Sequence, residues 1–172
     1  MIENQIGNNE ILKPKNDVVF QTLFTRGKEK ITKDLLEKIL KIKIHKLELD
    51  KSKDLLNENK NDKNGRLDLR AVINENIECD IEVQLTTHEK MIPRFLLYWA
   101  KMYSANLKVG EEYSKLRRTI SIIIVDGELP EFKGIKKAQT NWQIREEEYK
   151  NIILTSYFEI CIIESLTNCR RK

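Results

Sequence analysis

Two acidic residues, Asp68 and Glu82, each lie in a stretch in which polar and apolar residues alternate. Alternation with a period of two is typical of half-buried strands, so the sequence predicts strands over 67–73 and 79–85 with both acids on the polar faces. Carboxylate oxygens are the ligands that hard divalent cations such as Mg²⁺ prefer. If the two strands pair, Asp68 and Glu82 can hold a metal ion between them.

The turn between these strands decides how the two acids face each other. The segment 74–76 is polar and turn-prone, and it makes a three-residue loop between the strands. Both apolar faces must point into the core, which requires an odd-numbered loop. Asp68 then lies opposite Glu82, and Arg70 lies opposite Asp80, with Cβ atoms about 4.5–5.5 Å apart in each pair.

Two interpretations of this arrangement remain open from the residues alone. Like charges opposite each other are destabilising unless something lies between them, and a divalent cation bound by both carboxylates is one solution. In the alternative, the polar face is solvated. Arg70 then pairs with Asp80, and the carboxylates of Asp68 and Glu82 separate into water.

The elements that position this pair follow from the remaining periodicity. The run at 119–125 is continuously apolar and β-branched apart from one serine, which is typical of a strand buried on both faces. The order of elements predicts an α/β fold with a mixed sheet. Besides the two central strands, we expect helices over 18–24, 28–41 and 91–109 and strands over 42–49, 119–125, 142–144 and 158–163.

Composition places the chain among globular proteins of about one domain. Its 172 residues include 31 basic and 27 acidic ones, and the net charge of +4 mildly favours a polyanionic partner. The three cysteines show no CxxC spacing, so we expect reduced thiols rather than a disulfide framework or a zinc site. No signal peptide and no membrane-spanning apolar run of about 18 residues is present, so a cytoplasmic protein without membrane association is expected.

Several segments together resemble the Rpn-type recombination-promoting nucleases, also called PD-(D/E)XK nuclease family transposases. The resemblance covers about residues 11–165. The matching helix contains Arg94, Tyr98 and Trp99. The segments that carry the resemblance are 13–20, 23–24, 66–71, 79–84, 91–103 and 120–127.

This resemblance implies a restriction-endonuclease-like αβββαβ core, in which helices flank a mixed central sheet. It implies a domain over 13–165, between a flexible leader at 1–12 and a basic C-terminal tail at 166–172. The implied reaction is metal-dependent hydrolysis of DNA phosphodiester bonds, associated with recombination or mobile DNA. Self-association into a homo-oligomer remains open.

The resemblance also implies roles for individual residues. Asp68 and Glu82 would bind Mg²⁺, for which Mn²⁺ can substitute, and the backbone carbonyl of Val83 would add a ligand. Gln84 would be the third catalytic residue, at a position where the superfamily usually has lysine. Asp17 would be an accessory acid, although a place near a helix N-terminus also explains an aspartate through the helix dipole.

The glutamine at position 84 leaves an alternative function open. Glutamine orients water through hydrogen bonds but brings no charge, and Lys90 or Lys101 would have to compensate. Relatives commonly continue into a helical C-terminal region. A catalytically inactive or truncated copy of the fold, acting as a nucleic-acid- or protein-binding module, is therefore the alternative to a nuclease.

Overall fold

The computed structural model describes residues 29–50, 66–84 and 86–164. The predicted leader at 1–12, the helix at 18–24, the accessory acid Asp17 and the tail at 166–172 lie outside these residues.

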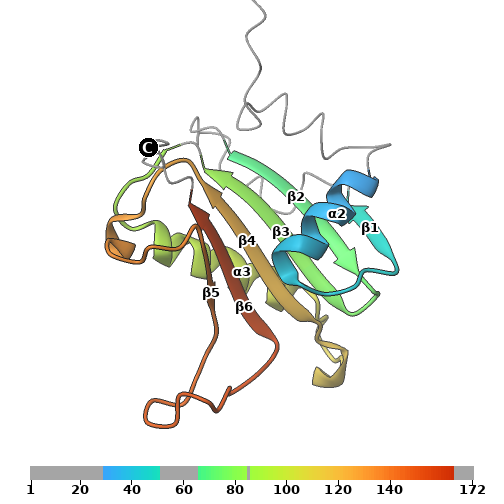
Figure 1. Ribbon diagram of the computed structural model, residues 1–172. Helices are drawn as coiled ribbons and strands as arrows, with labels where there is room; N and C mark the ends of the chain where they lie inside the picture. Colours follow the sequence, from blue (N-terminus) through green and yellow to red (C-terminus); the bar gives the residue numbers. More distant parts are fainter. Residues whose placement is uncertain (1–28, 51–65, 85, 165–172) are drawn as a thin grey trace, which may run out of the picture.

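A six-stranded mixed sheet forms the centre of the protein, in the order β1-β2-β3-β4-β6-β5 (Figure 1). β1 pairs antiparallel with β2, and β2 pairs antiparallel with β3. β3, β4 and β6 run parallel, and β5 is antiparallel to β6. The strands are β1 (Leu47–Asp50), β2 (Arg66–Ile73), β3 (Ile77–Gln84), β4 (Arg118–Val125), β5 (Gln139–Trp142) and β6 (Phe158–Glu164).

Two helices cover opposite faces of this sheet, α2 (Glu29–Leu40) on one side and α3 (Met91–Ala105) on the other (Figure 1). Two short 3₁₀ helices, η2 (Tyr113–Lys115) and η3 (Pro130–Phe132), lie in the connections on either side of β4. The described order contains the predicted αβββαβ core, which confirms the expected fold. Within the described ranges, no helix is long and apolar enough to cross a membrane.

The α2 face of the sheet holds the larger of two hydrophobic clusters. Leu36 and Ile39 of α2 belong to one buried cluster with Ala71 of β2 and with Cys79 and Ile81 of β3. Successive side chains of a strand point to opposite faces. The alternate, polar positions of β3 must therefore lie on the α3 side of the sheet.

The α3 face holds the second cluster. Met91 and Phe95 of α3 pack there with Ile123 of β4 and Ile160 of β6. The neighbouring Ile122 belongs to the cluster on the other face. This confirms the prediction that the β4 strand is buried on both sides, as expected for a central parallel strand covered by helices.

The predicted strand over 42–49 is longer than the observed β1. Over the first half of the predicted strand, backbone N–H groups donate to side chains rather than to a neighbouring strand. The Ile44 N–H donates to Glu37 Oε1 at 2.8 Å, and the N–H groups of His45 and Lys46 donate to Asn74 Oδ1 at 2.8 and 3.1 Å. Strand pairing can begin only after these contacts.

Two other predicted boundaries differ from the structure. Helix α3 ends at Ala105 rather than at 109, because the N–H of the capping residue Asn106 turns back to carbonyls of the last turn and Gly110 follows at φ 87°. Strand β5 occupies 139–142 rather than 142–144, because its pairing with β6 aligns Gln139 with Ile163.

The chain between β5 and β6 forms a projecting segment, residues 143–157, which we call the arm. It leaves the lower end of both strands and extends away from the sheet (Figure 1). Its two sides are joined by backbone hydrogen bonds from Leu154 N–H to the Ile144 carbonyl and from Glu146 N–H to the Ile152 carbonyl, both at 3.0 Å. The arm is therefore a hairpin with its own backbone pairing.

Cys79 and Cys161 are buried free thiols on the α2 face. The expectation of reduced cysteines is confirmed for these two residues, and Cys169 lies outside the described part of the chain.

Candidate active site

The backbone register places the two predicted acidic residues opposite each other. Asp68 of β2 is the Cα partner of Glu82 of β3, and Arg70 is the partner of Asp80. A three-residue turn at 74–76 joins the strands, as predicted from the sequence. The opposition of residues 68 and 82 is thus confirmed at the level of the backbone, while the Asp68 side chain lies outside the described part.

The polar face of β3 is buried and not solvated. Asp80 is 5 % exposed, Glu82 is 1 % exposed and Gln84 is 4 % exposed. The alternative in which the Glu82 carboxylate extends into water is therefore wrong. The Glu82 carboxylate is buried because α3 packs on this face of the sheet and excludes water from it.

A cation from α3 compensates the buried carboxylate. Arg94 Nη2 lies 3.3 Å from Glu82 Oε1, and the side chains are 17 % and 2 % exposed. A carboxylate that loses its hydration at such a depth is stable only when it is paired and hydrogen-bonded. Arg94 provides a charge partner for the Glu82 carboxylate inside the fold.

Gln84 bridges the acid and the guanidinium. Its Nε2 donates a short hydrogen bond to Glu82 Oε1, and its Oε1 accepts one from Arg94 Nη2 at 3.4 Å. An amide can meet both neighbours because it carries a donor and an acceptor, whereas a lysine ammonium only donates. A glutamine therefore fits between Glu82 and Arg94, where a lysine would bring two cations together.

The helix fixes the direction of Arg94. The residue lies near the start of α3, and its guanidinium carbon is 5.5 Å from the centre of the Tyr98 ring, one helical turn further on. A guanidinium over an aromatic face is attracted by the ring quadrupole and is held in place. Tyr98 thus orients the fork of Arg94 towards the end of β3.

The sequence left open whether Lys90 or Lys101 compensates for the missing lysine, and the structure brings Arg94 to Glu82 and Gln84. Lys90 is the residue that precedes α3, has a left-handed backbone with φ 70°, and is exposed. The signal that could have identified Arg94 is its place in the predicted helix, three residues after the apolar Met91 that anchors the helix start on the sheet.

The donor chemistry at this place fits a hard divalent cation. Glu82 offers carboxylate oxygens, and Asp68 is its partner across the ladder. Val83 is 3 % exposed with its side chain in the α2-side core, so only its backbone can contribute. Two carboxylates with waters suffice for Mg²⁺, which usually keeps part of its hydration shell. Among the side chains that the structure describes, no three His, Cys, Asp or Glu gather around one point.

A cavity of about 390 Å³ opens at the edge between β1, β2 and the C-terminal end of α3, and Glu82, Gln84 and Arg94 do not line it. Arg70 is the cation in its lining, beside the carboxylates of Glu48 and Glu78 and the amide of Asn106. The negative charges outnumber the positive one, so the lining does not favour a phosphate group. The cavity therefore does not extend the candidate site.

Comparison with known proteins gave one match. A family model described as PD-(D/E)XK nuclease family transposase matches residues 14–171 of the chain. No curated protein and no solved structure gave a significant match.

Proposed function

The chain belongs to the PD-(D/E)XK nuclease family transposases, and from this premise we propose that it is a Mg²⁺-dependent endonuclease that hydrolyses DNA phosphodiester bonds. The family comprises nucleases related to mobile DNA. The metal, the substrate and the residues that we propose rest on the site at the start of β2 and the end of β3.

The observation that carries the proposal is the buried set of Glu82, Gln84 and Arg94 opposite Asp68. An acidic residue at 1 % exposure and a glutamine at 4 % exposure are costly to bury, and here they contact each other and Arg94. Buried and mutually bonded polar groups of this kind are common at functional sites.

In the proposed site, the carboxylates of Asp68 and Glu82 and the carbonyl of Val83 hold the cation. When bound, the ion supplies polarisation of the phosphate and lowers the pKa of the attacking water. Mn²⁺ should replace Mg²⁺, because it takes the same oxygen ligands with similar geometry. Asp17 enters the proposal as an accessory acid.

The chain's own residues then divide the remaining work. Gln84 holds the attacking water by hydrogen bonding, since an amide can donate and accept. Arg94 takes the part that lysine plays elsewhere in the superfamily, because its guanidinium presents several donors to phosphate oxygens that gain charge in the transition state. To reach the phosphate, Arg94 must exchange its contact with Glu82 for the substrate when the carboxylate binds the cation.

Nicking of supercoiled plasmid tests this proposal. We expect the protein to convert supercoiled DNA to open-circular DNA with Mg²⁺ or Mn²⁺ but not with EDTA, and Asp68→Asn to abolish the conversion. Glu48→Gln, which removes an exposed carboxylate on the neighbouring strand β1, is the matched control and should cut normally.

The same assay separates the alternative functions. Cleavage that persists in Asp68→Asn would contradict the proposed site. A protein that binds DNA without cutting it in any divalent cation would be the inactive binding module. A parallel RNA substrate of the same sequence distinguishes the two nucleic acids.

A further inference from the structure

The outer edge of β5 is a place where the sheet can grow. Strand β5 is last in the order β1-β2-β3-β4-β6-β5, and among the described strands it pairs with β6 alone. Half of the backbone N–H and C=O groups of an edge strand point away from its neighbour and form a template for another strand. The four residues of β5 carry no charge and no proline that would protect this edge.

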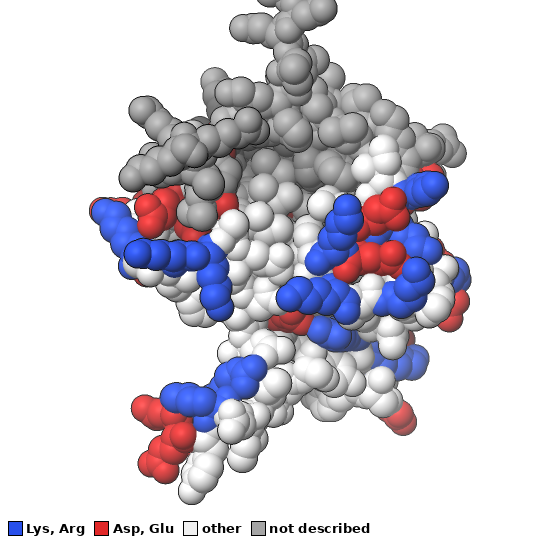
Figure 2. All heavy atoms as spheres, in the orientation of Figure 1, with Lys and Arg blue, Asp and Glu red and all other residues white. Residues whose placement is uncertain are grey.

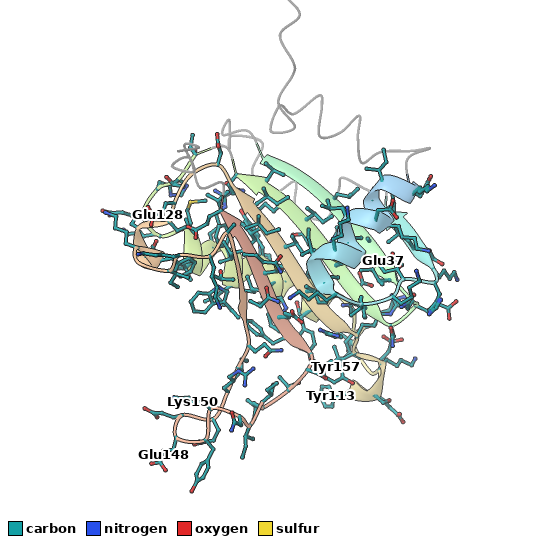
Figure 3. All side chains as sticks on the ribbon, viewed as in Figure 1. Glu37, Tyr113, Glu128, Glu148, Lys150 and Tyr157 are labelled. Atoms are coloured by element: carbon teal, nitrogen blue, oxygen red, sulfur yellow. The ribbon has the colours of Figure 1, made fainter. Side chains whose placement is uncertain are left out.

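The arm beside this edge exposes apolar side chains. Most of the large hydrophobic side chains exposed in the described part of the chain belong to residues 142–157. Among them Leu154 is 74 % exposed, Tyr149 is 66 % exposed and Ile152 is 56 % exposed. Figure 3 shows the arm standing clear of the sheet, with Glu148 and Lys150 at its end. Apolar side chains gathered in this way mark an interaction surface.

Opposite charges lie before and after β5. The segment 146–148 is Glu-Glu-Glu at the end of the arm, and all three residues are exposed. Figure 2 shows acidic side chains on the arm, where it stands apart from the main body. Before β5 the exposed residues Lys133, Lys136 and Lys137 follow η3 at the other end of the strand.

Several of these charges form no ion pair within the part of the chain that the structure describes. Among the residues that the structure describes, neither Glu147 nor Glu148 forms an ion pair, and the same holds for Lys133, Lys136 and Lys137. The two segments start at similar distances along the chain from the strand: 146–148 begins four residues after Trp142, and Lys136 and Lys137 lie within three residues before Gln139.

We propose that the protein forms a twofold dimer in which β5 pairs antiparallel with β5 of a second copy. In an antiparallel pair, the end of each strand lies beside the beginning of the other. The acidic end of one arm then approaches the lysine segment 133–137 of the second copy, and the reverse contact repeats it. Such self-complementary pairing is what a twofold axis requires.

The second copy is favoured over other occupants by the charges. The end of the arm carries the carboxylates of 146–148 and the two cations Arg145 and Lys150, so its net charge is negative and does not attract the phosphates of nucleic acid or of anionic lipid headgroups. The basic segment that complements these carboxylates lies on the same chain, at the position that antiparallel pairing demands. Such a dimer requires neither the metal nor cleavage.

Sedimentation velocity of the full chain over a range of concentrations tests the dimer. We expect a concentration-dependent dimer that weakens with salt, because the exposed charges are screened. Glu147→Lys combined with Glu148→Lys should weaken association by about tenfold or more, since like charges then face each other. Ile152→Asp combined with Leu154→Asp should also yield monomers, and both positions are exposed enough to leave folding intact.

An exchange of charges between the two segments is the decisive part of the experiment. Adding Lys133→Glu and Lys136→Glu to the Glu147→Lys, Glu148→Lys protein should restore the dimer. Glu89→Lys with Glu112→Lys makes the same change in net charge as Glu147→Lys with Glu148→Lys, but at other exposed positions, and it should leave association unchanged. A protein that is monomeric at all concentrations, or a dimer indifferent to reversal at 147 and 148, overturns the proposal. So does failure of the exchange to restore association.

Discussion

Arg94 Nη2 lies 3.3 Å from Oε1 of Glu82, so a guanidinium from the helix α3 meets a carboxylate of the strand β3 that is almost fully buried. The pair joins α3 to β3 close to Gln84, the last residue of the strand. Because Gln84 bonds to both partners, the three side chains form one unit. Properties of this unit can be tested separately from cleavage.

Removal of the guanidinium should affect cleavage more than metal binding. In Arg94→Ala the phosphate loses its charged donor, and we expect the single-turnover rate to fall by about 10²–10³-fold. The affinity for Mn²⁺ should be kept or increased, because a competitor for the Glu82 carboxylate is gone. Arg94→Lys should recover part of the rate.

Arg117→Ala is the control for this comparison, since it removes another arginine that pairs with a glutamate of β3, at 2.7 Å from Glu78. Its cleavage rate should stay near that of the unaltered protein. An Arg94→Ala protein that cuts at the normal rate would show that the guanidinium only supports the fold.

Gln84 should contribute to stability through both neighbours. Gln84→Leu keeps the size of the side chain but leaves the Glu82 carboxylate and Arg94 each with one hydrogen bond fewer, at a cost of about 1–3 kcal/mol. Combined with Arg94→Ala, the effects should be non-additive by about 0.5–3 kcal/mol, as expected for residues in one network. Urea unfolding of the four proteins measures this, and strictly additive values would refute the coupling.

The two buried cysteines should resist modification. Burial, followed by the negative charge of Asp80, raises the pKa of the Cys79 thiol well above its ordinary value. Burial, followed by the charge of Glu159, raises the pKa of Cys161 to about 12. Only the thiolate reacts with alkylating agents, so both residues should stay unmodified at pH 8 in the folded protein and react in urea. Mass spectrometry after iodoacetamide treatment distinguishes them from Cys169.

Glu37 should make stability depend on pH in the acid range. The hydrogen bond from the Ile44 N–H, helped by Lys43, lowers the pKa of the Glu37 carboxyl below its ordinary value. A depressed pKa contributes stability above the unfolded-state pKa, and this contribution is lost as the pH falls through the folded-state pKa. The unfolding free energy of the unaltered protein should therefore exceed that of Glu37→Gln at pH 6, and the difference should shrink towards pH 3. A difference that is constant between these pH values would contradict the assignment.

Parity and loop length were enough to predict the backbone of the site. Alternation along both strands and a three-residue turn give the pairing of residue 68 with 82, and the structure has that register. The burial of the polar face could not be predicted in the same way, because it depends on where α3 lies. For the same reason the role of Arg94 was missed: its distance to Glu82 is set by tertiary packing and not by spacing in the sequence.

The predicted edge elements were less accurate than the central ones. Strands β2, β3 and β4 are specified by their own alternation or apolar runs, whereas β1 and β5 are short and depend on their partners. Asn74 illustrates this, because its side chain takes the N–H groups of His45 and Lys46 that a longer β1 would have used for pairing. No local pattern announces such a long-range contact.

The most direct test of the central claim is a crystal structure of the protein soaked in Mn²⁺, with anomalous difference density. The proposed site predicts one strong peak between the carboxylates of Asp68 and Glu82, at about 2.0–2.3 Å from their oxygens, with Arg94 moved away from Glu82. A map without a peak there at saturating Mn²⁺, with Arg94 still bound to Glu82, would contradict it.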